Sequence, residues 1–280
     1  MYYTDNPIDN PTEDALGRDE FVNNLAKDIK QWNGEGSLVL ALYGPWGSGK
    51  SSVLNLLKRR MGNDDSCSIL SFDPWYFNSA EQLIQTFIST VKNEALKFAN
   101  KESQAKLTAE FRKYGAALSQ YVSWEPEIPL PGGLKIKLGK ISGKQKESES
   151  PEILRKGLIE LLGKTNRKSI ILIDNLDRLD PPELLLMFKL VRLCSDFPKF
   201  VYVLAFDHKQ VENLIAQQKI DTDFLAKIIQ LDIDLPLIDQ DDIDKFVEKN
   251  IRTMLNDFKL IVNENSWDRF AGAYRGLEQS

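Results

Sequence analysis

The sequence predicts an α/β protein in which a parallel sheet of about five strands is flanked by helices. Short apolar runs typical of buried strands alternate with longer stretches of helical spacing, as in successive βαβ units. A glycine-rich turn joins the first of these strands to a basic helix. That segment, "LVLALYGPWGSGKSSVLNLLKRR" at 38–60, is the most informative stretch of the chain.

The elements follow from the pattern in chain order. Strands are expected at Leu38–Tyr43, Ser68–Phe72, Ser169–Asp174, Phe200–Phe206 and Ile228–Leu235. Their apolar runs suit strands that are covered on both faces. Helices are expected at Ala80–Asn100, 101–121, Glu152–Leu162, Pro182–Cys194, Asp241–Leu255 and Ser266–Tyr274.

Composition narrows the function classes. The chain has 280 residues, a net charge of −5 and a pI near 5.2, which disfavours a generally basic nucleic-acid surface. Two cysteines and one histidine, Cys67, Cys194 and His208, are too few for a disulfide framework or a histidine-based metal site. No apolar run approaches eighteen residues, and the first twelve residues are polar, so we expect a cytoplasmic protein without a membrane span.

The turn after the first strand matches G-x-x-x-x-G-K-[ST], the phosphate-binding loop or Walker A motif. Its glycines let backbone N–H groups converge on an anion, and the following helix turns its positive end to the same phosphates. We expect nucleotide contacts from Gly44, Pro45, Trp46, Gly47, Ser48, Gly49, Lys50, Ser51 and Ser52. Lys50 would lie between the β- and γ-phosphates, and the Ser51 hydroxyl would coordinate Mg²⁺. The alternative is a glycine-rich strand–helix turn that happens to carry a lysine.

A second motif follows the strand at Ser169–Asp174. Ligands of parallel sheets lie at the carboxyl ends of the strands, so Asp174 is expected to meet the loop there and to hold Mg²⁺ through water, as a Walker B residue. The alternative role, capping the next helix, suits Asp180 before Pro181 better.

Between the two motifs lie 174 − 50 = 124 residues, more than a compact sheet needs. Much of the excess is an insertion at about 101–150, expected to be helical to residue 121, with a small hairpin within 132–141 and a flexible loop at 139–150. A solvated loop is the favoured interpretation. The alternative is a docking surface at 132–146, where basic and apolar residues could touch anionic lipid or a nucleic-acid backbone. Its lysines are Lys135, Lys137, Lys140, Lys144 and Lys146.

Several segments resemble the KAP family of P-loop NTPases. They are "LGRDEFVNNLAKDI", "GPWGSGKSS" with Trp46 inside the loop, "SFDPWYF", "IDNLDRLDPPELL", "FPKFVYVLAFDHKQV" and "FLAKIIQLDIDLPL". The resemblance implies the strand order 5-1-4-3-2, ATP with Mg²⁺ as ligands, and Arg18 beside the adenine and ribose. It also implies a role in membrane-associated signalling complexes or, in bacteria, in the exclusion of phage. Many members carry transmembrane helices in the insertion, where this chain has polar sequence.

The polar insertion is one departure from the family pattern, and Asn175 is another. It stands where an acid usually follows the Mg²⁺ aspartate. An asparagine can orient a water molecule but cannot accept its proton, so hydrolysis is expected to be slow and Asn175→Asp to raise it. Alternatively Asp177 or Asp207 provides the carboxylate, with Asp207 placed as a γ-phosphate sensor. Asp177 and Arg178 could also form an ion pair at a helix start. Lys227 is either a flank of the fifth strand or a phosphate contact.

These observations predict an NTPase domain at 1–237 and a small helical lid at 238–280. The favoured function is a switch: Mg–ATP binds, the lid and insertion close or self-associate, and slow hydrolysis resets them. The alternative is a regulatory or scaffold module that binds ATP with little turnover. In either case we expect a protein partner or self-association.

Overall fold

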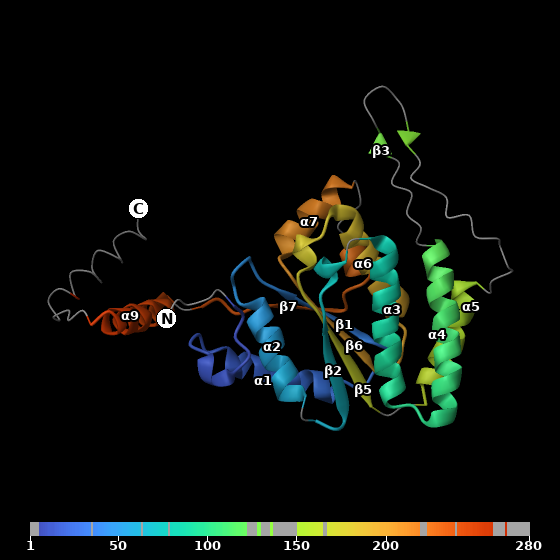
Figure 1. Ribbon diagram of the computed structural model, residues 1–280, viewed down its shortest axis with the longest axis horizontal. Coiled ribbons are helices and arrows are strands. Elements are labelled where there is room, and N and C mark those ends of the chain that lie inside the picture. Colours follow the sequence, from blue (N-terminus) through green and yellow to red (C-terminus); the bar gives the residue numbers. More distant parts are fainter. Residues whose placement is uncertain are drawn as a thin grey trace.

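The computed structural model describes residues 6–34, 36–62, 64–77, 79–121, 128–129, 135–136, 150–164, 167–218, 223–238, 240–259 and 267. Its centre is a parallel sheet of five strands in the order β2-β5-β6-β1-β7 (Figure 1). The strands are β1 (Leu38–Tyr43), β2 (Cys67–Phe72), β5 (Lys168–Ile173), β6 (Phe200–Phe206) and β7 (Leu231–Asp234). Read from the opposite edge, this is the predicted order 5-1-4-3-2, which is confirmed.

Helices cover both faces of the sheet (Figure 1). On one face, α1 (Arg18–Gln31) and α2 (Lys50–Met61) pack against side chains such as Leu40 and Leu42 of β1. On the other face, α3 (Ala80–Lys97), α6 (Pro181–Cys194) and α7 (His208–Gln217) bury the alternate residues, Val39 and Ala41 among them. The alternation follows from the two-residue period of a strand. In an outer layer, α4 (Lys101–Tyr121) packs on α3, and α5 (Pro151–Leu162) packs on α4.

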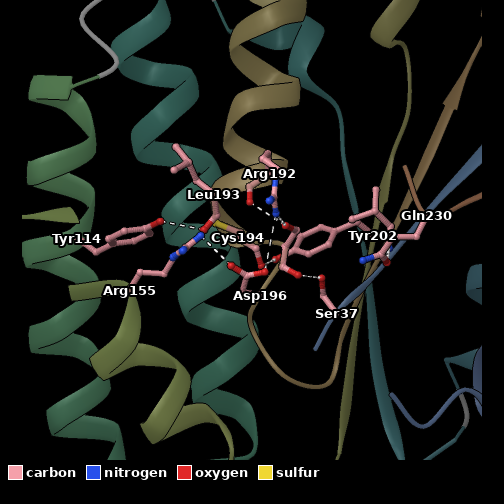
Figure 2. Close-up of polar contacts among 11 residues, drawn as sticks. Ser37, Tyr114, Arg155, Arg192, Leu193, Cys194, Asp196, Tyr202 and Gln230 are labelled. Atoms are coloured by element: carbon pink, nitrogen blue, oxygen red, sulfur yellow. Dashed lines mark hydrogen bonds and ion pairs between the residues drawn. The ribbon is translucent and has the colours of Figure 1, made fainter. Parts of the chain in front are cut away.

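Side chains from three directions fix the carboxyl end of α6, as Figure 2 shows. The Tyr114 hydroxyl of α4 donates to the Leu193 carbonyl at 2.9 Å, and the Tyr202 hydroxyl of β6 donates to the Cys194 carbonyl at 3.3 Å. Arg155 of α5 pairs with Asp196 at 2.8 Å. The two tyrosine hydroxyls use carbonyls that the helix itself leaves unpaired, and the ion pair involves Asp196, two residues beyond the helix. They therefore anchor the carboxyl end of α6 to α4, β6 and α5.

The remaining elements differ in detail from the sequence prediction. β7 runs from Leu231 to Asp234 and is shorter than the predicted Ile228–Leu235, because Ile228 lies in a turn and residues 229–230 only lead into the strand. The hairpin of the insertion pairs β3 (Ile128–Pro129) with β4 (Lys135–Ile136), so its first strand precedes the predicted range of 132–141. The four lysines of the basic loop beyond Lys135 lie outside the described residues.

Short 3₁₀ turns and two further helices complete the fold. The turns are η1 (Pro11–Glu13), η2 (Pro74–Tyr76) and η3 (Leu176–Arg178), and the helices are α8 (Asp223–Ala226) and α9 (Gln240–Asp257). Figure 1 shows α9 apart from the sheet, and apart from Trp267 the helix predicted at 266–274 lies outside the described residues. In the part of the chain that the structure describes, no helix combines the length and the apolarity that a membrane crossing needs.

Candidate nucleotide-binding site

The turn between β1 and α2 has the backbone geometry of an anion-binding loop. Gly47 (φ 78°) and Gly49 (φ 93°) lie in the left-handed region, where a side chain is strained, and Gly49 is the N-cap of α2. Within the described residues, the N–H groups of Gly49, Lys50 and Ser51 donate no hydrogen bond. Three amides at a helix start, which also carries the positive end of the helix dipole, suit a phosphate group.

Lys50 is held at the centre of this loop. The residue is only 8% exposed, and its ammonium donates to the carbonyls of Gly44 at 2.9 Å and Pro45 at 3.1 Å. The same ammonium lies 3.7 Å from Oδ2 of Asp177. The charge is therefore fixed beside the free amides, as the sequence predicts for a lysine that contacts phosphates.

Ser51 and Asp174 meet at the carboxyl edge of the sheet, as predicted. The pKa of the Asp174 carboxyl is raised above its usual value, mainly by burial and also by the charges of Asp73 and Asp177. Hydrogen bonds from the Ser51 hydroxyl and the backbone N–H of Asn175 oppose this rise. A hydroxyl and a carboxylate oxygen are the ligand types that Mg²⁺ prefers. This pair therefore fits the metal, and a cation bound there would relieve the cost of the partly buried charge.

Asn175 links two carboxylates. Its backbone is in the left-handed region (φ 58°), which asparagine tolerates better than most residues. Its N–H donates to Oδ1 of Asp174 at 2.9 Å, and its side-chain amide donates to Oδ2 of Asp73 at 2.6 Å. Asp73 directly follows β2 and also caps η2 through the Trp75 N–H at 3.0 Å.

Asp73 is not among the site residues predicted from the sequence. The signal was present, because Asp73 follows a predicted strand just as Asp174 does. That signal indicates a site residue only if β2 is known to pair with β5, because this pairing brings Asp73 beside Asp174.

The two alternative carboxylates, Asp177 and Asp207, are engaged with the fold. Asp177 is 4% exposed, and its Oδ2 accepts the Asp207 N–H at 3.0 Å besides facing Lys50. Asp207 follows β6 and caps α7 by accepting the Gln210 N–H at 3.1 Å. Both aspartates therefore lie at the predicted edge of the sheet, where they join the loop, η3 and α7.

Arg178 stacks on aromatic rings. Its guanidinium lies 4.6 Å from the ring centroid of Trp46 in the loop and 5.2 Å from that of Trp75 after β2. Trp46 is 61% exposed and Trp75 52%. Among the described residues Arg178 has no ion pair, so the alternative of an Asp177–Arg178 pair is not what forms.

Arg18 connects the loop to the chain beyond β7. It is 5% exposed, and its guanidinium donates to the Ser48 carbonyl at 3.3 Å and to the Pro236 carbonyl. Burial lowers the pKa of Arg18, against an opposing effect of Asp14. The Ser52 hydroxyl accepts the N–H of Ile8 at 3.3 Å.

Lys227 lies at the opposite edge. It comes shortly before Gln230, whose N–H donates to the Val39 carbonyl near the amino end of β1. The alternative of a phosphate contact for Lys227 is therefore wrong.

Comparisons with known proteins agree with this architecture. Residues 18–268 match the KAP family P-loop domain. The chain is 26% identical over 263 residues to the phage T7 exclusion protein of Escherichia coli (strain K12), an alignment that covers 83% of this chain and 34% of that protein. The chain thus spans about a third of the length of this relative.

Two solved structures are more distantly similar. The Aeropyrum pernix Orc1 protein, solved in complex with DNA, is 14% identical with a TM-score of 0.43, covering 85% of this chain and 50% of Orc1. A Walker-type ATPase of Pyrococcus abyssi is 15% identical with a TM-score of 0.45, covering 93% of this chain and 63% of the ATPase.

Proposed function

Because the chain belongs to the KAP family of P-loop NTPases, we propose that it binds Mg–ATP through residues 44–52 and hydrolyses it slowly as a conformational switch. The observation that carries the proposal is the loop itself. A buried lysine and three amides without partners among the described residues face one edge of the sheet, next to the Ser51–Asp174 pair. Such an arrangement binds a phosphate chain together with a divalent cation.

Each group has a distinct part in this function. The amides at the start of α2 would hold the phosphates, and the Lys50 ammonium would exchange its carbonyl partners for phosphate oxygens. Ser51 and Asp174 would hold Mg²⁺, which when bound supplies positive charge against the phosphate oxygens. Because phosphoryl transfer depends mainly on positioning and electrostatics, these residues account for most of the expected rate.

The switch would act through two contacts of the loop. Arg178 joins Trp46 to the turn after β5, and Arg18 joins Ser48 to Pro236, which leads into α9. A loop that rearranges around phosphates would change both contacts. Closure of α9 as a lid, and association with a protein partner or a second copy, remain part of this proposal.

Titration with ATP tests the binding site. Lys50→Ala removes the main cation and should weaken Mg–ATP binding at least about tenfold, equivalent to about 1.4 kcal/mol. Lys58→Ala, an exposed lysine on the same helix, is the matched control and should bind as the unmodified protein does. If Lys50→Ala and Lys58→Ala bind Mg–ATP equally well, the phosphate site lies elsewhere.

A second candidate function is a regulatory module that binds ATP with little turnover. Asn175 favours it, because the position after Asp174 lacks an acid and its side chain is already committed to Asp73. Binding of ATP without phosphate release above that of Lys50→Ala would identify this function.

We also propose a role in the exclusion of phage. The support is the relative named as a phage T7 exclusion protein, of which this chain covers 34%. Phage plating on cells that express the chain, with Lys50→Ala as the comparison, tests this role. Protection that needs Lys50 supports it, and equal plating on both strains contradicts it.

A further inference from the structure

Asp73 lies beside the metal-site aspartate because their strands are neighbours. β2 and β5 pair in parallel with Phe72 opposite Ile173, so Asp73 and Asp174 are the next residues on adjacent strands. The Asp174 N–H donates to the Phe72 carbonyl at 3.3 Å, which keeps the two strand ends in register up to this point. The charge of Asp73 contributes to the raised pKa of Asp174, as expected for two nearby carboxylates.

Asn175 fixes the Asp73 carboxylate in place. The 2.6 Å bond from the Asn175 side-chain amide to Oδ2 and the 3.0 Å bond from the Trp75 N–H to Oδ1 hold the two oxygens separately. Each carboxylate oxygen has a second lone pair available for a further donor. Asp73 is also only partly buried, so a water molecule can reach it.

The other carboxylates of this edge are occupied differently. Asp177 is buried against Lys50 and the Asp207 N–H, and Asp207 caps α7. Asp174 forms the metal pair with Ser51. Asp73, like Asp174 and Asp207, is partly exposed and is held by neutral donors. It differs from them in its place, because it neither belongs to the Ser51–Asp174 pair nor caps a long helix.

We propose that Asp73 is the general base for ATP hydrolysis and that Asn175 is its positioning residue, an inference that rests on the proposed function. The oxygen of a water molecule forms a bond to the γ-phosphorus while the bond from that phosphorus to the β–γ bridging oxygen breaks. ADP leaves with the electron pair of that bond. The proton of the water passes to the Asp73 carboxylate and is then released to solvent, so that ATP and water yield ADP and phosphate.

This assignment gives Asn175 a role that the sequence did not suggest. The carboxylate that usually follows the Walker B aspartate would be moved to the adjacent strand, and the asparagine would orient it from the usual position. Asn175→Asp would then place two carboxylates at hydrogen-bond distance without a donor between them. The variant should lose turnover rather than gain it, contrary to the expectation from the sequence alone.

Phosphate release and Mg–ATP affinity are measured on the unmodified chain and on five variants. They are Asp73→Asn, Asn175→Asp, the exchange Asp73→Asn with Asn175→Asp, Lys50→Ala as the blank and Asp180→Asn as the control. Asp73→Asn should lower kcat at least about 100-fold, the scale of a general base, with nearly unchanged affinity. The exchange restores the hydrogen bond with its direction reversed, so it should be as stable as the unmodified protein yet remain slow. Asp180→Asn, an exposed aspartate after the same turn, is the control and should retain kcat.

Three results would overturn the assignment. Asp73→Asn could keep its kcat, Asn175→Asp alone could raise kcat, or Asp73→Asn could lose Mg²⁺-dependent affinity instead of turnover. An unchanged kcat in Asp73→Asn would show that Asp73 is not the base. A higher kcat in Asn175→Asp would show that a carboxylate at position 175 acts as the base. A loss of Mg²⁺-dependent affinity in Asp73→Asn would show that Asp73 helps to hold the metal. An unmodified protein with no turnover above Lys50→Ala overturns the proposed hydrolysis itself, and this inference with it.

Discussion

The Lys50 ammonium lies 3.7 Å from the Asp177 carboxylate, and both residues are buried, at 8% and 4% exposure. The pair joins the loop after β1 to the turn after β5. Asp177 also receives the N–H of Asp207, so three strand ends meet at one side chain. We infer that Asp177 holds the edge of the sheet together around the lysine.

Asp177→Ala should therefore destabilise the protein by about 3 kcal/mol, because it leaves the buried Lys50 ammonium without its counter-charge and the Asp207 N–H without its acceptor. Urea denaturation without nucleotide measures the change. Asp180→Ala, at an exposed position three residues later, should stay within about 0.5 kcal/mol of the unmodified protein, because Asp180 is the N-cap of α6 but its side chain makes no capping hydrogen bond. Similar unfolding free energies for the two variants would show that Asp177 has no such structural role.

Trp46 should report nucleotide binding by its fluorescence. It lies in the loop, is 61% exposed, and is stacked on Arg178, so phosphates entering the loop should change its surroundings. We expect Mg–ATP to change the tryptophan emission, and Trp46→Phe to remove most of that change. Trp32→Phe, which alters an indole packed beside α1 and away from the loop, should preserve it. A signal that survives in Trp46→Phe would refute this prediction.

Asp174 should make stability depend on pH. Its pKa is raised in the folded protein, mainly by burial, so the folded state binds more protons than the unfolded chain as the pH rises past the ordinary value of 3.8. The unfolding free energy therefore falls through that window and levels off above the raised pKa. Asp174→Asn should be more stable than the unmodified protein at neutral pH, and the gain should disappear on acidification. Thermal unfolding without Mg²⁺ across this pH range measures the gain, and a gain that does not vary with pH would show that the buried Asp174 charge is not its cause.

The fold was predictable because its signals are local. β1 and β6 have the predicted bounds, since their runs are apolar throughout. β2 begins one residue before its predicted start, and β5 is shifted by one residue at each end. The predicted β7 was too long because residues 228–229 are apolar to fill the core and not because they belong to the strand. Ile228 is buried in the core on one face of the sheet although it lies in a turn.

The site was predictable in its motifs but not in its long-range contacts. Lys50, Ser51 and Asp174 meet as expected, since parallel strands bring their carboxyl ends to one edge. The bond from Asn175 to Asp73 spans 102 residues and depends on a left-handed backbone at Asn175. Likewise, an ion pair of Arg178 with Asp177 was one of two alternatives, whereas the neighbouring indoles of Trp46 and Trp75 offer Arg178 a cation–π site. Neither contact follows from the spacing of residues along the chain.

Phosphate release from ATP by the purified chain, compared with Lys50→Ala and Lys58→Ala, tests the central claim most directly. We predict slow release that saturates with ATP, requires Mg²⁺ and disappears in Lys50→Ala, because the ammonium at the loop is the main positive charge that the protein supplies to the β- and γ-phosphates. Lys58→Ala should release phosphate at the unmodified rate. Release that is equal in Lys50→Ala and Lys58→Ala would contradict the claim that this loop binds and hydrolyses ATP.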